Sequence, residues 1–100
     1  MKYKIVIENL AKEDLRNATK WYDTQQKGLG RTFLTTIKKN IAQIKKHPFI
    51  AQIRYFEVHT TVVDTYPYLI HYFIDPDRKA IVIIGVLHTS RNPFIWNQRI

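Results

Sequence analysis

The side chains that could carry out acid–base chemistry in this sequence lie toward its C-terminal end. His88 closes an apolar run, and Arg91 follows it three residues later. A histidine can accept a proton near neutral pH and an arginine can hold a phosphate oxygen, so the two could meet at one phosphodiester, with Tyr72 as a further proton-transfer group. A histidine at a strand end near tyrosines is more often a hydrogen-bonding structural residue, and this second interpretation stays open.

The other ionisable side chains show no metal-binding pattern. The four histidines are dispersed, with no His-x-x-His spacing and no paired carboxylates, and the chain has no cysteine. Asp75 and Asp77 flank a proline, which turn formation explains. His71 stands between apolar neighbours and is expected to be a half-buried packing residue. We therefore predict no metal and no cofactor.

The charge balance points to an anionic partner. Lys and Arg number 16 against 8 acidic residues, a net charge of +8 on 100 residues, so a polyanion or an acidic protein is favoured. Arg31, Lys38 and Lys45 repeat every seven residues and share one stripe of a predicted helix, with Lys39 and Lys46 beside it. A solvated helix face and a phosphate-binding surface both fit this stripe.

Two amphipathic helices should position the stripe. After a short strand over residues 3–7, Asn9 offers a helix N-cap, and a face with helical spacing follows at Ala11, Leu15, Ala18 and Tyr22. Gly28 and Gly30 are expected to end this helix. The second helix carries its apolar face at Phe33, Ile37, Ile41 and Ile44, and it stops at His47-Pro48.

The second half of the chain changes to a period of two residues, which predicts strands. Two short strands are expected on either side of a turn near Thr60, and two longer ones over residues 68–74 and 80–88, joined by the Asp75-Pro76-Asp77 turn. The consecutive apolar residues 81–84 predict a central strand covered on both faces. The tail 92–100 is expected to form a short helical turn.

The order of these elements predicts an α+β fold, β-α-α-β-β-β-β, with a helical hairpin packed on a twisted, mostly antiparallel sheet. A chain of this length has room for one core, so residues 1–100 are expected to form a single domain. The opening segment shows neither a signal peptide nor a membrane anchor, and we predict a cytoplasmic protein.

The element order resembles that of the RelE/ParE toxin family, and several short motifs resemble it too. The helical pattern from Asp14-Leu15 through Trp21-Tyr22 is similar, and so are the segments 66–72 (YPYLIHY) and 86–93 (VLHTSRNP), Gly30-x-x-Phe33 and Trp96-x-x-Arg99. The similarity spans nearly the whole chain. It implies a type II toxin–antitoxin pair, in which a cognate antitoxin wraps the toxin and forms a hetero-oligomer with it.

Members of this family differ in chemistry. RelE-like members cleave messenger RNA on the ribosome, whereas ParE-like members are taken to poison DNA gyrase and need no catalytic residues. In RelE-like nucleases, lysines lie on the strand corresponding to Arg54–Val58, but this chain has no lysine between Lys46 and Lys79. Leu69 and Thr89 stand near the positions of two further basic residues of those nucleases.

These differences favour a ParE-like toxin that binds its target and is not an enzyme. Arg91 and Arg99 accompany the family-like tail and are candidates, with the helical stripe, for target or nucleic-acid contact. An exposed Trp96 would be an anchor for the antitoxin. Two alternatives remain: a ribosome-dependent, metal-independent endoribonuclease using His88, Arg91 and Tyr72, and a non-toxic domain that only binds an antitoxin.

Overall fold

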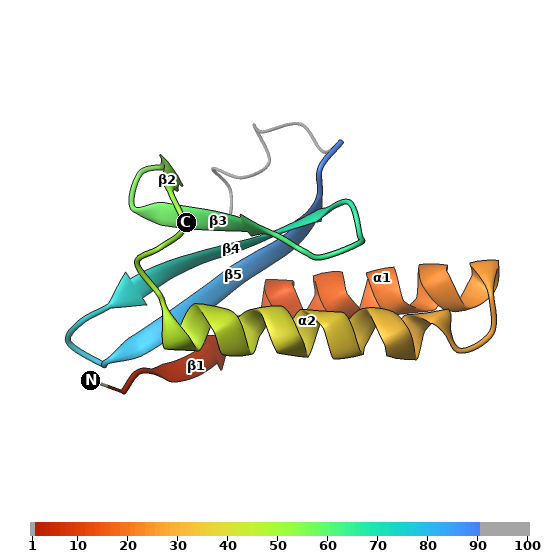
Figure 1. The fold of residues 1–100 in the computed structure, drawn as a ribbon, viewed down its shortest axis with the longest axis horizontal. Coiled ribbons are helices and arrows are strands. Elements are labelled where there is room, and N and C mark those ends of the chain that lie inside the picture. Colours follow the sequence, from red (N-terminus) through yellow and green to blue (C-terminus); the bar gives the residue numbers. More distant parts are fainter. Residues whose placement is uncertain (1, 91–100) are drawn as a thin grey trace.

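Two helices lie on one face of a five-stranded sheet in the computed structural model, which describes residues 2–90 (Figure 1). The elements follow in the order β1 (Lys4–Ile7), α1 (Asn9–Gln25), α2 (Leu29–Lys46), β2 (Ile53–Tyr55), β3 (Val58–Val62), β4 (Tyr68–Asp75) and β5 (Ala80–His88). This architecture confirms the predicted α+β fold with a helical hairpin on one face.

The sheet is mixed, with the strand order β1-β5-β4-β3-β2. β1 pairs in parallel with β5, and the other neighbours are antiparallel, as the prediction of a mostly antiparallel sheet requires. In β5 the residues Ile81, Val82 and Ile83 are 0% exposed and Ile84 is 5% exposed. The prediction that this strand lies inside the sheet with both faces covered is therefore confirmed.

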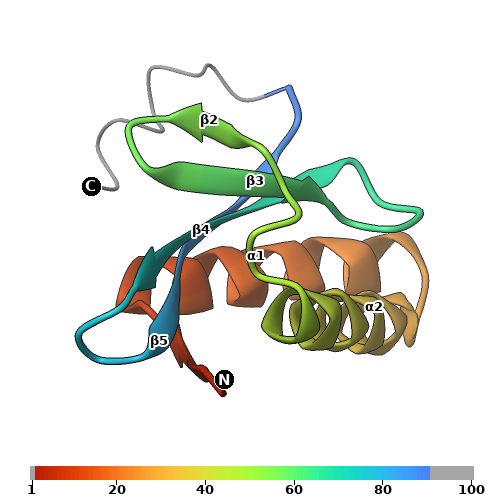
Figure 2. The ribbon, with the colours of Figure 1, turned by 60° about the vertical axis from the view of Figure 1, so that its left-hand side comes forward.

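Both helices lie on the same face of the sheet (Figure 2), and the residues of their predicted apolar faces are buried or partly buried in the core. Tyr22 of α1 and Phe33 of α2 are buried, with ring centroids 5.1 Å apart. Each of them also packs edge-on against Tyr66, at 5.1 Å. Burying one such side chain stabilises the fold by about 1.5–3 kcal/mol. In residues 2–90, no helix is long and apolar enough to cross a membrane.

The start of α1 lies one residue earlier than the sequence predicted. Glu8 is the N-cap residue and makes no side-chain capping bond, while Asn9 is already helical. The backbone N–H of Glu8 donates to the carbonyl of Ile83 at 2.9 Å, so strand pairing determines where β1 ends and the helix begins. Asn9 is therefore not the cap, because a tertiary hydrogen bond outweighs its capping preference.

The two glycines near the helical turn have different roles. Gly28 adopts a φ of 86° and caps α2, which suits a residue without a Cβ. Gly30 lies inside α2, although the sequence placed it at the break. A Cβ on Gly30 would lie 2.6 Å from the carbonyl oxygen of Thr19, so its role is to let the two helices approach closely.

The turn between the first two strands of the second half was predicted at the wrong place. It lies between Tyr55 and Val58, with Phe56 at a φ of 48°, and Thr60 is a paired residue of β3. A two-residue turn preserves the alternation of side chains, and no glycine, asparagine or proline marks this one. The sequence pattern therefore ran through the turn without a visible break.

The chain leaves the sheet after Val62, although the alternation extends to Tyr66. Asn40 of α2 is 4% exposed, and its carbonyl oxygen accepts the backbone N–H of Asp64 at 3.1 Å. Its amide nitrogen donates to the Asp64 carboxylate at 3.3 Å. These contacts hold the loop before β4 against α2, where the sequence had suggested a continuing strand.

Candidate functional site

The predicted cationic stripe lies on the solvent side of α2. Arg31, Lys38 and Lys45 are all exposed, whereas Phe33 and Ile37 on the sheet side of the same helix are buried. Within residues 2–90, none of the three cations forms an ion pair. Their charge is therefore not neutralised by a neighbouring carboxylate and adds to the field that an anionic partner meets.

Near the C-terminal end of α2, Lys45 and three further lysines line a hollow of about 600 Å³. We call it the lysine hollow; it is lined by Lys2, Tyr3, Lys39, Ala42, Gln43, Lys45 and Lys46. The beginning of the chain lies beside this end of α2, next to β1 (Figure 1). Lys2 was missed by the sequence analysis because only the tertiary fold brings it to a helix that ends more than forty residues later.

His88 lies in a second hollow, of about 210 Å³, between α1 and the end of β5. We call it the His88 hollow; it is lined by Asp14, Asn17, Ala18, Trp21, Tyr68, Val86, Leu87 and His88. The backbone N–H of Ser90 donates to His88 Nδ1 at 3.0 Å, and the Ser90 hydroxyl lies 2.7 Å from the same nitrogen. A neutral His88 ring therefore carries its proton on Nε2 and is a donor there.

Tyr72 is not brought together with His88. In the sheet Tyr72 pairs with Ile83 in the middle of β4, whereas His88 pairs with Tyr68, the first residue of that strand. The Tyr72 side chain is 0% exposed, and its hydroxyl donates to the carbonyl of Pro48 at 2.8 Å. Burial raises the pKa of the Tyr72 hydroxyl above its ordinary value. These contacts give Tyr72 a structural role and argue against the expected proton transfer.

The two histidines of the middle strands are also held by internal contacts. His59 stacks on Tyr72 with ring centroids 5.1 Å apart, and its Nδ1 donates to the carbonyl of Ala51 at 2.7 Å. His71 is 0% exposed, which is deeper than the half-buried position that was expected, and its Nδ1 lies 3.1 Å from the Tyr55 hydroxyl. Both rings connect strands or loops to one another.

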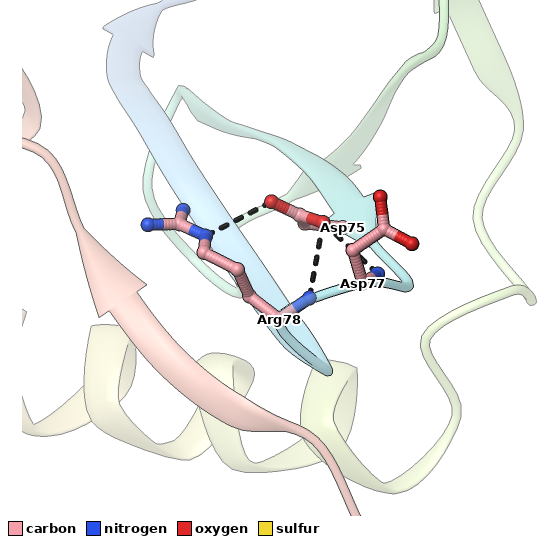
Figure 3. Close-up of polar contacts among 3 residues, drawn as sticks. All are labelled: Asp75, Asp77 and Arg78. Atoms are coloured by element: carbon pink, nitrogen blue, oxygen red, sulfur yellow. Dashed lines mark hydrogen bonds and ion pairs between the residues drawn. The ribbon is translucent and has the colours of Figure 1, made fainter.

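The aspartates of the β4–β5 connection are turn residues (Figure 3). Asp75 accepts the backbone N–H groups of Asp77 and Arg78 at 3.1 and 3.2 Å, and its second oxygen lies 2.9 Å from Arg78 Nε. The hydrogen bond from the Arg78 backbone, with help from its side chain, holds the pKa of Asp75 below its ordinary value. Within residues 2–90, no group of three or more potential ligands is placed to hold a metal ion.

Three candidate residues of the tail, Arg91, Trp96 and Arg99, lie outside the described residues, as does the predicted helical turn over residues 92–100. Their expected roles in target and antitoxin contact remain predictions. Of the remaining candidates, the structure brings Lys45 to the lysine hollow and places Arg31 and Lys38 elsewhere on α2.

Comparison with protein families gives a match over most of the chain. The model that describes the ParE toxin of the type II toxin–antitoxin system parDE matches residues 5–93. No curated protein sequence matches the chain.

Solved structures of toxin–antitoxin systems share the fold. The chromosomal ParDE system from P. aeruginosa superposes with a TM-score of 0.79 at 12% identity, covering 89% of this chain and 98% of that one. A chain of the E. coli RelBE complex gives a TM-score of 0.68 at 17% identity, covering 89% and 99%. A chain of the RelBE2 complex from Mycobacterium tuberculosis gives 0.62 at 16% identity, covering 88% and 99%. At these identities the likeness shows the fold alone.

Proposed function

The chain belongs to the ParE toxin family of type II toxin–antitoxin systems, and on this premise we propose that it arrests growth by binding a nucleic-acid machine such as DNA gyrase. We further propose that a cognate antitoxin neutralises it in the cytoplasm by forming a hetero-oligomer with it. The observation that carries the proposal is the family match over residues 5–93, which spans both helices and, apart from Lys4 of β1, all five strands.

The geometry of the ionisable residues supports binding over strand cleavage. Cleavage by a neighbouring 2′-hydroxyl needs a proton acceptor, a cation at the phosphorane and a proton donor within reach of one phosphate. Tyr72 is buried with its hydroxyl bonded to Pro48, and Ser90 already donates to His88 Nδ1. Neither group is poised as a free proton acceptor.

The exposed cations supply a surface for the target. Arg31, Lys38 and Lys45 lie along the exposed side of α2, and we assign them to target contact together with Arg91 and Arg99 of the tail. A row of cations raises the rate of encounter with a polyanionic assembly and makes binding sensitive to salt. Trp96 is proposed as an aromatic anchor for the antitoxin, because large aromatic side chains dominate the energetics of many interfaces.

Induction of the chain in a bacterial host tests the proposal. We expect growth arrest with a change in DNA supercoiling while messenger RNA stays intact, and rescue when the reading frame next to the gene is co-expressed. Purified chain should inhibit supercoiling by purified gyrase. Growth arrest with normal supercoiling, both in cells and with purified gyrase, would exclude gyrase as the target. If induction had no effect on growth, the chain would be a domain that only binds an antitoxin.

One observation keeps a ribosome-dependent endoribonuclease as the second candidate: His88 lines an open hollow beside Asp14 and Tyr68. His88→Gln removes the titratable ring while retaining a polar side chain. For a binding toxin, this variant should arrest growth as strongly as the original chain. Cleavage of ribosome-bound messenger RNA by the original chain, lost in His88→Gln, would instead establish the nuclease.

A further inference from the structure

The lysine hollow gathers four cations without a compensating carboxylate. Lys2, Lys39, Lys45 and Lys46 line it, and none of the lining residues in the described chain is acidic. Within residues 2–90, none of the four ammonium groups forms an ion pair or a side-chain hydrogen bond. Like charges gathered around one cavity repel one another, so an anion that entered it would relieve this repulsion.

Helix solvation explains only part of this arrangement. Lys45 and Lys46 lie in the last turn of α2, where cations interact favourably with the helix dipole by about 0.3–1 kcal/mol each. Lys39 lies two turns earlier, and Lys2 belongs to a different segment of the chain. Neither of these two belongs to the last turn of the helix, and both nevertheless line the same hollow.

The spacing of the lysines fits an extended anion better than a free phosphate. Lys39 and Lys46 are seven residues apart on α2, which is about 10 Å along the helix axis. Both can contact successive charged groups of a polymer without bending toward one point. The volume of about 600 Å³ lies within the range of about 300–1,000 Å³ that ligand pockets usually have.

Tyr3 is the aromatic residue that lines the lysine hollow. Phe49 packs edge-on against Tyr3 with ring centroids 6.4 Å apart, and it lines a neighbouring hollow that shares Tyr3 and includes Glu57. Phe49 is 65% exposed, so most of its ring is open to a ligand. A cationic groove with accessible aromatic rings is the combination by which proteins hold single-stranded nucleic acid without sequence preference.

Other occupants fit less well. An amphipathic protein helix needs several aliphatic anchors in its groove, and Ala42 is the one aliphatic residue in the described lining. A second copy of this chain would bring another net charge of +8 against the same cations.

We propose that the lysine hollow binds the phosphate backbone of single-stranded nucleic acid, with one base stacked on the ring of Phe49. This binding does not depend on which machine the toxin targets. The chain would then contact nucleic acid directly, in addition to the proposed contact with a protein target such as gyrase.

Fluorescence anisotropy with a labelled single-stranded DNA of about 12 nucleotides tests the proposal on the full chain. The double variant Lys39→Gln/Lys46→Gln removes two charges from the hollow. It should weaken binding roughly tenfold or more at about 0.1 M salt and reduce the magnitude of the salt slope by about 1.4, which corresponds to two lost phosphate contacts. The matched control Lys12→Gln/Lys20→Gln removes two exposed charges from α1 and should change affinity by less than about threefold.

The stacking contact has its own matched pair. Phe49→Ala should weaken binding about fivefold or more, whereas Ile50→Ala in the same loop should leave it unchanged. Ile50 is 82% exposed and Phe49 65%, so neither truncation removes a core residue. Circular dichroism melting curves of all four variants establish that each is folded at the assay temperature.

Four results would overturn the proposal. The first is that the oligonucleotide does not bind at low salt, and the second is that the hollow and α1 double variants lose the same amount of affinity. The third is that a duplex of the same length binds with the same affinity and Phe49→Ala has no effect. The fourth is that polyglutamate of matching charge competes as well as the unlabelled oligonucleotide. The last result would reassign the hollow to an acidic protein. The binding assay contains neither gyrase nor growing cells. A negative result in it therefore does not contradict the proposed gyrase target, and normal supercoiling in the gyrase assay does not contradict binding of single-stranded nucleic acid.

Discussion

The lysine hollow and the His88 hollow differ in what their charged and polar side chains contact. In the His88 hollow, Asp14 accepts the backbone N–H of Val86 at 3.0 Å, and His88 accepts that of Ser90 at 3.0 Å. The ammonium groups of the lysine hollow have no such partner within residues 2–90. His88, whose type suggested catalysis, therefore bonds to the backbone. The lysines of α2, for which a solvated helix face was one of two interpretations, are available to a ligand.

The largest effect is expected where a polar side chain is most deeply engaged. Tyr72→Ala should lower the free energy of unfolding by about 3–5 kcal/mol, because it removes a fully buried ring. Tyr72→Phe should cost about 1–3 kcal/mol, because the Pro48 carbonyl loses its donor. Urea denaturation followed by circular dichroism measures both. Full stability of Tyr72→Phe together with loss of toxicity would reverse the assignment and make Tyr72 a functional group.

A substitution of Asp14 tests whether the polar residues of the His88 hollow support the fold. Its carboxylate accepts the Val86 N–H at a part of β5 that extends beyond its pairing with β1, which ends at Ile83. Asp14→Ala should lower the free energy of unfolding by about 1–3 kcal/mol, since a backbone donor loses its partner.

Hydrogen exchange of the Val86 amide measures the Asp14 effect locally and should become faster. Asp14→Asn keeps an acceptor oxygen and should behave nearly as the original chain. If both variants were equally stable and equally protected from exchange, the carboxylate would not be the element that supports this strand edge.

A smaller, pH-dependent effect is expected at Asp75. Its folded pKa lies below the unfolded value of about 4. Its stabilising contribution is therefore present above the unfolded pKa and is lost as the pH falls through the folded pKa. The melting temperature of Asp75→Asn should therefore depend less on pH below about 4 than that of the original chain. Identical pH profiles would show that the turn does not favour the ionised carboxylate.

The smallest effect on stability is expected for substitutions in the lysine hollow. Lys39→Gln/Lys46→Gln should lower the free energy of unfolding by less than about 1 kcal/mol, because both side chains are exposed, form no ion pair within residues 2–90, and lose only the interaction of Lys46 with the helix dipole. Chemical denaturation measures this directly. A loss as large as that of Asp14→Ala would show that these lysines support the fold, and would remove the contrast between the two hollows.

Hydrophobic periodicity predicted most helices and strands, because each of these elements repeats its apolar pattern within its own residues. The helical spacing of Ala11, Ala18 and Tyr22 placed one buried face, and the consecutive apolar residues 81–84 placed an interior strand. The same rules failed where a tertiary contact replaced a local signal. The turn at Phe56 carries no turn-forming residue, and Gly30 serves a helix crossing where a helix break had been expected.

The candidate site divides in the same way. The sequence by itself determined the net positive charge, the cationic stripe of α2 and the resemblance to a toxin family, because these depend on residue type and on spacing within one element. Only the tertiary structure decided that Lys2 joins α2 at one hollow and that Tyr72 lies apart from His88. Strand pairing and packing between distant segments determine these placements, and local periodicity carries no information about either.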